Sequence, residues 1–194
     1  MDNNALVKEK IFNAAEQRML RFGYRKVTMD EIAQDLGMSK NTIYQQFQSK
    51  EELAKSLVRR LQQQINSGLD NIEKTQKDPL TIFSDSILFL RKKLGPWFAH
   101  FFREIPAELP SLWEEFLRYR NEKILDIRFL VERGIKKGVF RKVHSAIAVQ
   151  AYLGAVKAII NTRFLEQEKL SFDQALDAVL DIWASGILKK GKKK

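Results

Sequence analysis

Two amide side chains, Asn41 and Gln45, lie four residues apart in the segment SKNTIYQQF, residues 39–47. Residues four apart share one face of a helix. An amide can donate and accept a hydrogen bond together, and this combination matches the N6/N7 edge of adenine in the major groove. With Ile43 and Phe47 facing inward, both amides face outward and are candidates for reading DNA bases. The alternative is that they form only a polar helix surface, like the two glutamines that follow.

Other side chains of the same segment are suited to the phosphates of DNA. Lys40 and Tyr44 flank the amide face on one side, and Thr42 flanks it on the other. Ammonium and hydroxyl groups donate hydrogen bonds to phosphate oxygens, as do the free backbone donors at the start of a helix. Such contacts would hold the protein on DNA without reading its sequence.

The residues that must position these side chains follow a helix-turn-helix pattern. Residues 28–53, TMDEIAQDLGMSKNTIYQQFQSKEEL, predict two short helices around a turn at Gly37 and then the start of a third helix. Thr28 and Glu31 predict a capping box at the start of the first short helix. In this motif the second helix enters the major groove. Apolar residues of both short helices can meet across the turn: Ile32, Ala33 and Leu36 from the first, and Ile43 and Phe47 from the second.

Helical periodicity continues along nearly the whole chain, and no segment has the alternating pattern of a strand. The sequence therefore predicts an all-α protein. Gly95-Pro96 is expected to end one helix, and Pro106 and Pro110 are expected to bracket a loop. About nine helices are expected, at roughly 4–22, 28–36, 39–47, 49–76, 79–93, 97–103, 111–138, 145–166 and 171–188.

We expect two domains and a tail. Residues 4–53 form the helix-turn-helix DNA-binding domain, from which the linking fourth helix runs on to about residue 76. Residues 77–188 form a helical effector-binding and dimerisation domain, and residues 189–194, KKGKKK, form a basic disordered tail. The helix over 145–166 is apolar nearly all round, which is typical of a helix buried on every side. We expect a homodimer through the last two helices, the alternative being a core within one chain.

The formal charge of +10 is compatible with a nucleic-acid partner, but its distribution matters more than its size. Residues 1–60 carry 11 Lys and Arg against eight Asp and Glu, and the terminal KKGKKK adds five positive charges. Half of the excess positive charge therefore lies in this terminal lysine run, and such runs are usually solvated and disordered. Such a run can also add a weak, salt-sensitive attraction to phosphates.

Several classes of protein are disfavoured by composition. The chain has no cysteine and only two histidines, so we expect no disulfide, no metal site and no cofactor. No nucleophile has a base partner, no carboxylate pair lies in an apolar setting, and no glycine loop is suited to phosphates, so we expect no enzyme activity. No secretion signal and no apolar run of about 20 residues is found. We expect a soluble, cytoplasmic protein.

Aromatic residues are concentrated between residues 83 and 140. Apolar pockets between bundled helices are typical binding sites for small molecules. As a group these aromatics predict an apolar effector cavity in this region, although core packing is the better explanation for any single one of them. The expected lining residues are Trp97, Phe101, Trp113, Phe116, Tyr119 and Tyr152.

The region from residue 11 to residue 53, about a quarter of the chain, resembles the DNA-binding domain of the tetracycline-repressor (TetR) family. Arg18 departs from the pattern, because the family usually has an apolar residue at this place. The packing of the first helix around Arg18 is therefore in doubt. The residues that carry the resemblance are Ile11, Ala14, Ala15, Gly23, Tyr24, Thr28, Ile32, Ala33, Leu36, Gly37, Ser39, Lys40, Thr42, Ile43, Tyr44, Phe47 and the run 49–53, SKEEL.

The resemblance implies a bacterial homodimeric transcriptional regulator, located at the nucleoid when it is bound to DNA. By the same resemblance, Thr28, Lys40, Thr42, Tyr44 and Lys50 match positions that grip the DNA backbone. The expected activity is repression, with a small hydrophobic effector releasing the protein from a palindromic operator. The alternative is an architectural or constitutive DNA-binding protein that has no effector.

Overall fold

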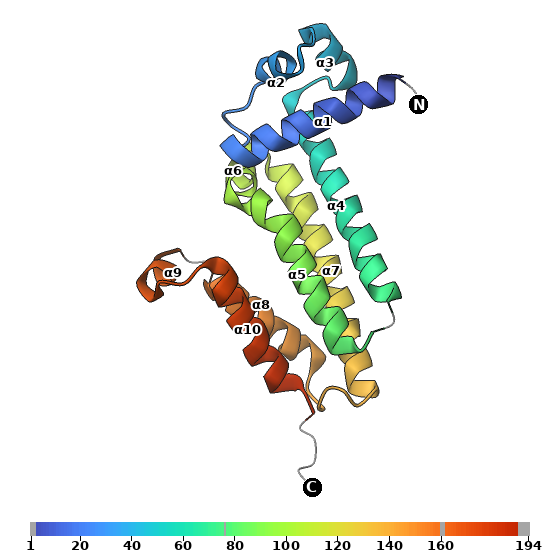
Figure 1. Cartoon of the computed structure of the whole chain (residues 1–194), viewed down its shortest axis with the longest axis vertical. Coiled ribbons are helices and arrows are strands. Elements are labelled where there is room, and N and C mark those ends of the chain that lie inside the picture. Colours follow the sequence, from blue (N-terminus) through green and yellow to red (C-terminus); the bar gives the residue numbers. More distant parts are fainter. Residues whose placement is uncertain (1–2, 76, 160–161, 190–194) are drawn as a thin grey trace. The chain divides into compact units, whose positions relative to one another are not determined.

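The computed structural model describes residues 3–75, 77–159 and 162–189 (Figure 1). Within these residues the protein is all-α, as predicted. The lysine-rich run lies outside the described residues apart from Lys189. The described residues form ten helices: α1 (Asn3–Phe22), α2 (Met29–Leu36), α3 (Lys40–Gln46), α4 (Lys50–Lys74), α5 (Pro79–Ala99), α6 (Phe101–Glu108), α7 (Pro110–Lys136), α8 (Ser145–Ile159), α9 (Thr162–Glu168) and α10 (Phe172–Ile187).

The chain divides into two compact units by its internal contacts. The first unit combines the residues up to Asn71 with Leu88–Arg120, and the second combines Ile72–Ile87 with the residues from Asn121 onward. Helices α4, α5 and α7 therefore contribute residues to both units. No helix among the described residues is long and apolar enough to cross a membrane.

The first unit has one apolar core that joins α1, α2 and α3 to α4 and α6. Ile11, Ile32 and Ile43 are completely buried in it, one from each of the first three helices. Gly37 ends α2 in the left-handed region, with φ of 60°. Glycine adopts this conformation at little cost, so α3 can begin only three residues later, at the angle that a helix-turn-helix needs.

The second unit is built around an aromatic stack. Trp183 of α10 stacks on Phe83 of α5 with ring centroids 4.0 Å apart, and its Nε1–H donates to the carbonyl oxygen of Ala148 at 2.7 Å. This bond satisfies the only polar group of a buried indole. Helices α8 and α10 lie side by side (Figure 1).

The glycines of the second unit differ in the space around them. A Cβ atom added at Gly134 of α7 would lie 2.2 Å from the ring of Phe140, so that ring occupies the place of a side chain. Gly154 of α8 and Gly186 of α10 have no such neighbour within 4 Å. Close packing within this unit therefore requires glycine at residue 134, and does not require it at residues 154 and 186.

Several predicted helix boundaries near prolines were wrong. Helix α5 continues through Gly95-Pro96 to Ala99, and Pro106 lies inside α6. Each proline removes one hydrogen bond, and the burial of Trp97 and Ile105 compensates for that loss. Helix α7 begins at Pro110, the first helical position that proline favours. The predicted loop between the two prolines is therefore helical except at Leu109.

The predicted helix over 145–166 is described as two helices, α8 and α9, and residues 160–161 lie outside the described residues. The expectation of about nine helices was one short of the described number for this reason. Two other helices begin at side-chain caps. Asp78 caps α5 through the backbone N–H groups of Leu80 and Thr81, and Ser171 forms a capping box with Gln174 at α10.

Candidate nucleic-acid interface

Helix α3 has one buried face and one exposed face. Ile43 and Phe47 are buried, and the ring of Phe47 packs edge-on against Phe12 of α1 with centroids 5.1 Å apart. Asn41 and Gln45 are exposed on the other side of the helix. The predicted inward and outward faces of α3 are therefore confirmed, while base reading by the two amides stays a prediction.

The hydroxyl groups of this surface are held by local hydrogen bonds. Ser39 caps α3, its Oγ accepting from the backbone N–H of Thr42 at 3.1 Å. The Thr42 hydroxyl lies 2.9 Å from the same Oγ, and its side chain is half-buried. Tyr44 is 45% exposed, so its ring and hydroxyl are accessible from solvent. Tyr44 is therefore more accessible to a phosphate than the half-buried Thr42.

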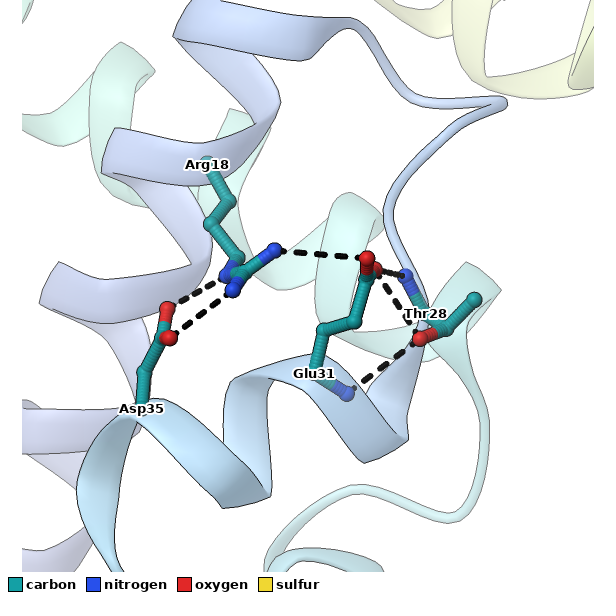
Figure 2. Close-up of polar contacts among 4 residues, drawn as sticks. All are labelled: Arg18, Thr28, Glu31 and Asp35. Atoms are coloured by element: carbon teal, nitrogen blue, oxygen red, sulfur yellow. Dashed lines mark hydrogen bonds and ion pairs between the residues drawn. The ribbon is translucent and has the colours of Figure 1, made fainter.

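Thr28 and Glu31 form the predicted capping box at the start of α2, shown in Figure 2. Glu31 Oε2 accepts from the backbone N–H of Thr28 at 2.9 Å and from its hydroxyl at 3.0 Å. In return, the Thr28 hydroxyl oxygen accepts from the backbone N–H of Glu31 at 3.2 Å. The two hydrogen bonds from Thr28 lower the pKa of Glu31 below its ordinary value.

Arg18 joins α1 to α2 through two carboxylates (Figure 2). Its Nη2–H donates to Asp35 Oδ1 at 2.8 Å, its Nε–H donates to the other oxygen of Asp35, and its Nη1 lies 3.5 Å from Glu31 Oε1. The hydrogen bond to Arg18 lowers the pKa of Asp35. The sequence left the packing around Arg18 in doubt, and these contacts resolve it, because a bidentate ion pair takes the place of an apolar contact.

The two lysines predicted to grip phosphates are bound to groups of the protein itself. Lys40 forms an ion pair with Asp30 of α2, and both side chains are largely exposed. Lys50 donates to the carbonyl oxygen of Tyr24 at 3.1 Å, and its ammonium lies 4.2 Å from the centre of the Tyr24 ring. Partial burial lowers the pKa of Lys50. Because an ammonium has three N–H donors, a phosphate would share each lysine with these groups of the protein.

A set of contacts between α6 and the turn after α1 was not predicted. Glu104 accepts from the backbone N–H of Arg25 at 2.7 Å, and Glu108 accepts from the Arg25 Nε–H at 2.9 Å. The Glu104 carboxylate also packs on Gly23, whose φ is 85°. These partners are about 80 residues apart in the chain, and no local pattern in the sequence pairs them.

Five of the six aromatics expected to line an effector cavity belong to the first unit. Trp97 contacts Phe101 at 5.1 Å between ring centroids, and Trp113 stacks on Phe116 at 5.7 Å. The Tyr119 hydroxyl donates to Asn66 Oδ1 at 3.0 Å. Two pairs of these rings are therefore in contact, as is usual in a core: Trp97 with Phe101, and Trp113 with Phe116.

Tyr152 belongs to the second unit. Its ring lies 5.4 Å from Phe83 and 5.7 Å from Trp183 between centroids. The structure thus assigns the predicted lining residues to two separate aromatic clusters, and effector binding by either cluster stays a prediction.

The first unit also has an open groove that the sequence did not indicate. Its volume is about 410 Å³. The groove is polar and contains more cationic than anionic groups, and none of the six aromatics expected to bind an effector lines it. Arg60 pairs with Glu9 across it and lies over the ring of Phe12. The lining residues are Lys8, Glu9, Phe12, Ser56, Arg59, Arg60 and Gln63.

No group of three or more His, Asp or Glu side chains in the described residues is arranged to hold a metal ion. The side chains of the surface around α3 can form hydrogen bonds and ion pairs. The exposed side chains of Asn41, Gln45, Lys40 and Tyr44 are suited to a nucleic-acid duplex. Thr42 and Lys50 carry suitable donors too, but both are half-buried.

Comparisons with known proteins agree with this geometry. Residues 11–57 match the sequence model of the family described as bacterial regulatory proteins, tetR family. No curated protein sequence matches the chain.

Three solved structures resemble the chain over nearly its full length. A protein from Saccharomonospora viridis, described as a transcriptional regulator and solved in complex with choline, is 19% identical with a TM-score of 0.81, covering 96% of this chain and 100% of its own. A TetR-family transcriptional regulator from Agrobacterium tumefaciens is 19% identical with a TM-score of 0.78 and the same coverage. SmeT in complex with triclosan is 19% identical with a TM-score of 0.70, covering 96% of this chain and 93% of its own. At this identity the likeness establishes the fold.

Proposed function

On the premise that residues 11–57 match the tetR family of bacterial regulatory proteins, we propose that the chain is a homodimeric transcriptional repressor that binds a palindromic operator. The observation that carries the proposal is the two-faced helix α3. Ile43 and Phe47 anchor it to the core, and Asn41 and Gln45 are exposed on its outer side. An anchored helix with exposed amides can enter the major groove without losing its own packing.

In this proposal the groups around α3 hold the DNA backbone. Tyr44 and Thr42 donate hydroxyl hydrogen bonds, and Lys40 and Lys50 add positive charge. Thr28 contributes its donors at the start of α2. Lys40 is the better charge contact, because its ammonium is largely exposed whereas Lys50 is half-buried against Tyr24. Each lysine that neutralises a phosphate would make binding more sensitive to salt.

The proposed dimer forms through α8 and α10. Ile147 of α8 is 66% exposed and Ile182 of α10 is 72% exposed, although both helices bury their other faces within the second unit. Exposed apolar side chains on neighbouring helices are typical of a surface that a second subunit covers. A two-fold dimer would present two α3 helices to half-sites about 34–36 Å apart, or one turn of the duplex.

Selection of bound sequences from a random pool of duplexes, followed by footprinting, tests DNA recognition. The repressor predicts protection of a short palindrome. An architectural DNA-binding protein, the alternative function, predicts extended protection without a preferred sequence. The exposed amide face of α3 favours the first outcome, since a protein that binds only phosphates has no need of paired base readers.

Replacement of either amide by alanine should weaken operator binding in a sequence-dependent way. We expect Asn41→Ala and Gln45→Ala each to cost about 1–3 kcal/mol on the selected operator and to relax the preference at one base position. Lys40→Ala is the matched comparison, and it should weaken binding to all sequences alike and reduce the salt dependence. Repeating the selection with each variant measures the preference. An unchanged preference in both amide variants would assign base reading to other residues.

We propose further that a small hydrophobic effector releases the DNA. The complexes of two structurally similar proteins with choline and with triclosan support a small-molecule site in this fold. In this chain the first unit offers Trp97, Phe101, Trp113, Phe116 and Tyr119 as lining candidates. An effector can lower operator affinity only by binding the DNA-free conformation more tightly.

Titration of the protein–operator complex with a panel of small apolar and aromatic compounds tests this part of the proposal. We expect at least one compound to lower operator affinity by about 5–150-fold, the usual range of coupling between two sites. The same compound should bind the free protein, detected as a change in the fluorescence of Trp97 and Trp113. A panel without any effect on operator affinity would favour a constitutive DNA-binding protein.

A further inference from the structure

Both hydrogen-bond donors of Thr28 are bound to a single carboxylate oxygen. Its backbone N–H and its hydroxyl donate to Glu31 Oε2 at 2.9 Å and 3.0 Å. A hydroxyl has only one proton, and here that proton points at the protein's own carboxylate. Thr28 is exposed on the surface, yet it has no donor left for a phosphate.

The Glu31 carboxylate therefore lies where a DNA phosphate would have to bind. Both groups are anions, and both would take the same donors at the start of α2. A phosphate oxygen can accept from Thr28 only after Glu31 Oε2 has released those donors. Because like charges repel, a carboxylate that stays in place also opposes an approaching phosphate.

Arg18 offers the Glu31 carboxylate a second partner (Figure 2). Its Nη1 is 3.5 Å from Glu31 Oε1, while two other nitrogens of the same guanidinium are held by Asp35. The Arg18 side chain is only 22% exposed, so it is fixed more firmly than a surface arginine. Glu31 can therefore shift from Thr28 toward a cation that is already in place, by a side-chain rotation.

We propose that Glu31 competes with a DNA phosphate for the donors of Thr28, and that Arg18 is a positioning residue that favours the phosphate by drawing the Glu31 carboxylate to itself. This inference rests on the proposed function, in which Thr28 contacts the DNA backbone. It assigns the two residues opposite effects on DNA affinity although both stabilise the junction of α1 and α2. If Glu31 and Arg18 only stabilised this junction, replacing either residue would change DNA affinity in the same direction.

Two variants test the competition. Glu31→Gln keeps an acceptor for the capping box and removes the competing charge, so it should tighten DNA binding. Arg18→Met removes the second partner of the Glu31 carboxylate, so it should weaken binding. We expect each change to be roughly two- to fivefold, the size of an exposed charge contact. Arg18→Lys keeps the charge and should retain part of the wild-type affinity.

Matched controls separate this effect from the general charge of the domain. Glu16→Gln and Arg21→Met make the same charge changes at two residues of α1 outside the network shown in Figure 2. The probe is a fluorescently labelled duplex that the wild-type protein has selected from a random pool, and anisotropy gives the affinity at one fixed salt concentration. Circular dichroism and thermal unfolding are recorded for every variant, and Arg18→Gln, which also removes the charge, replaces Arg18→Met as the test variant if the latter does not fold.

The double variant Glu31→Gln/Arg18→Met tests whether Arg18 acts through Glu31. If it does, removing Arg18 once Glu31 is neutral weakens binding by no more than Arg21→Met does, since coupled residues are not additive. The inference is overturned if Glu31→Gln binds no more tightly than Glu16→Gln, if Arg18→Met binds no more weakly than Arg21→Met, or if the Arg18 effect persists in the double variant. A wild-type protein that selects no duplex would overturn the proposed function itself.

Discussion

Phe47→Ala is expected to lower the free energy of unfolding of the first unit by about 3–5 kcal/mol, the usual cost of removing a buried ring. Phe47 is 1% exposed and packs on Phe12 at the end of α3. Without this ring the cavity lies directly behind the proposed reading helix, so operator binding should be lost as well. Urea unfolding, with hydrogen exchange of the α3 amides as a local probe, measures the change.

Tyr44→Ala is the matched comparison, because it removes an aromatic ring from the exposed face of the same helix. We expect it to change the unfolding free energy by no more than about 0.5 kcal/mol and to weaken DNA binding only through the lost backbone contact. A Phe47→Ala protein that kept both its stability and its operator affinity would contradict the orientation described for α3.

Ile182→Glu is expected to convert the proposed dimer into monomers. The side chain is 72% exposed in the single subunit, so the substitution should not disturb the fold of the chain. In the proposed dimer it would bury two unpaired carboxylates, one from each copy. An unpaired buried charge costs about 3–5 kcal/mol, which corresponds to a rise of roughly 100-fold or more in the dimer dissociation constant.

Sedimentation equilibrium over a range of protein concentrations measures this effect. Leu6→Glu serves as the control, because Leu6 is an exposed leucine of α1 in the other unit and its replacement should leave the dimer intact. If Ile182→Glu remained dimeric at the same concentrations as the wild-type protein, the subunits would have to associate through another surface. Loss of the palindromic footprint should accompany dissociation, since one monomer can occupy only one half-site.

The helix-turn-helix could be predicted from sequence because its determinants are local. Thr28 with Glu31, the glycine at residue 37, and Ser39 before α3 each act within a few residues. Local hydrogen bonds of this kind appear as short spaced patterns. The inward turn of Ile43 and Phe47 follows from the period of the helix, and the structure confirms it.

The interactions between helices could not be predicted in the same way. Arg18 meets Asp35 from 17 residues away, and Arg25 meets Glu108 from 83 residues away. Charged residues are frequent on helix surfaces, so the sequence gives no reason to pair these particular ones. The same limit applies to the helices that contain Pro96 and Pro106. Proline disfavours the interior of a helix, but the burial of Trp97 and Ile105 outweighed that cost.

The glycines of the second unit separate two sources of evolutionary constraint. At residue 134 the ring of Phe140 fills the space of a side chain, so selection against larger residues there originates within one polypeptide. Residues 154 and 186 have free space around them, and alanine is the better helix former. In the proposed dimer, selection for glycine at these two residues would reflect the close approach of the second copy, and a map of tolerated substitutions would test this.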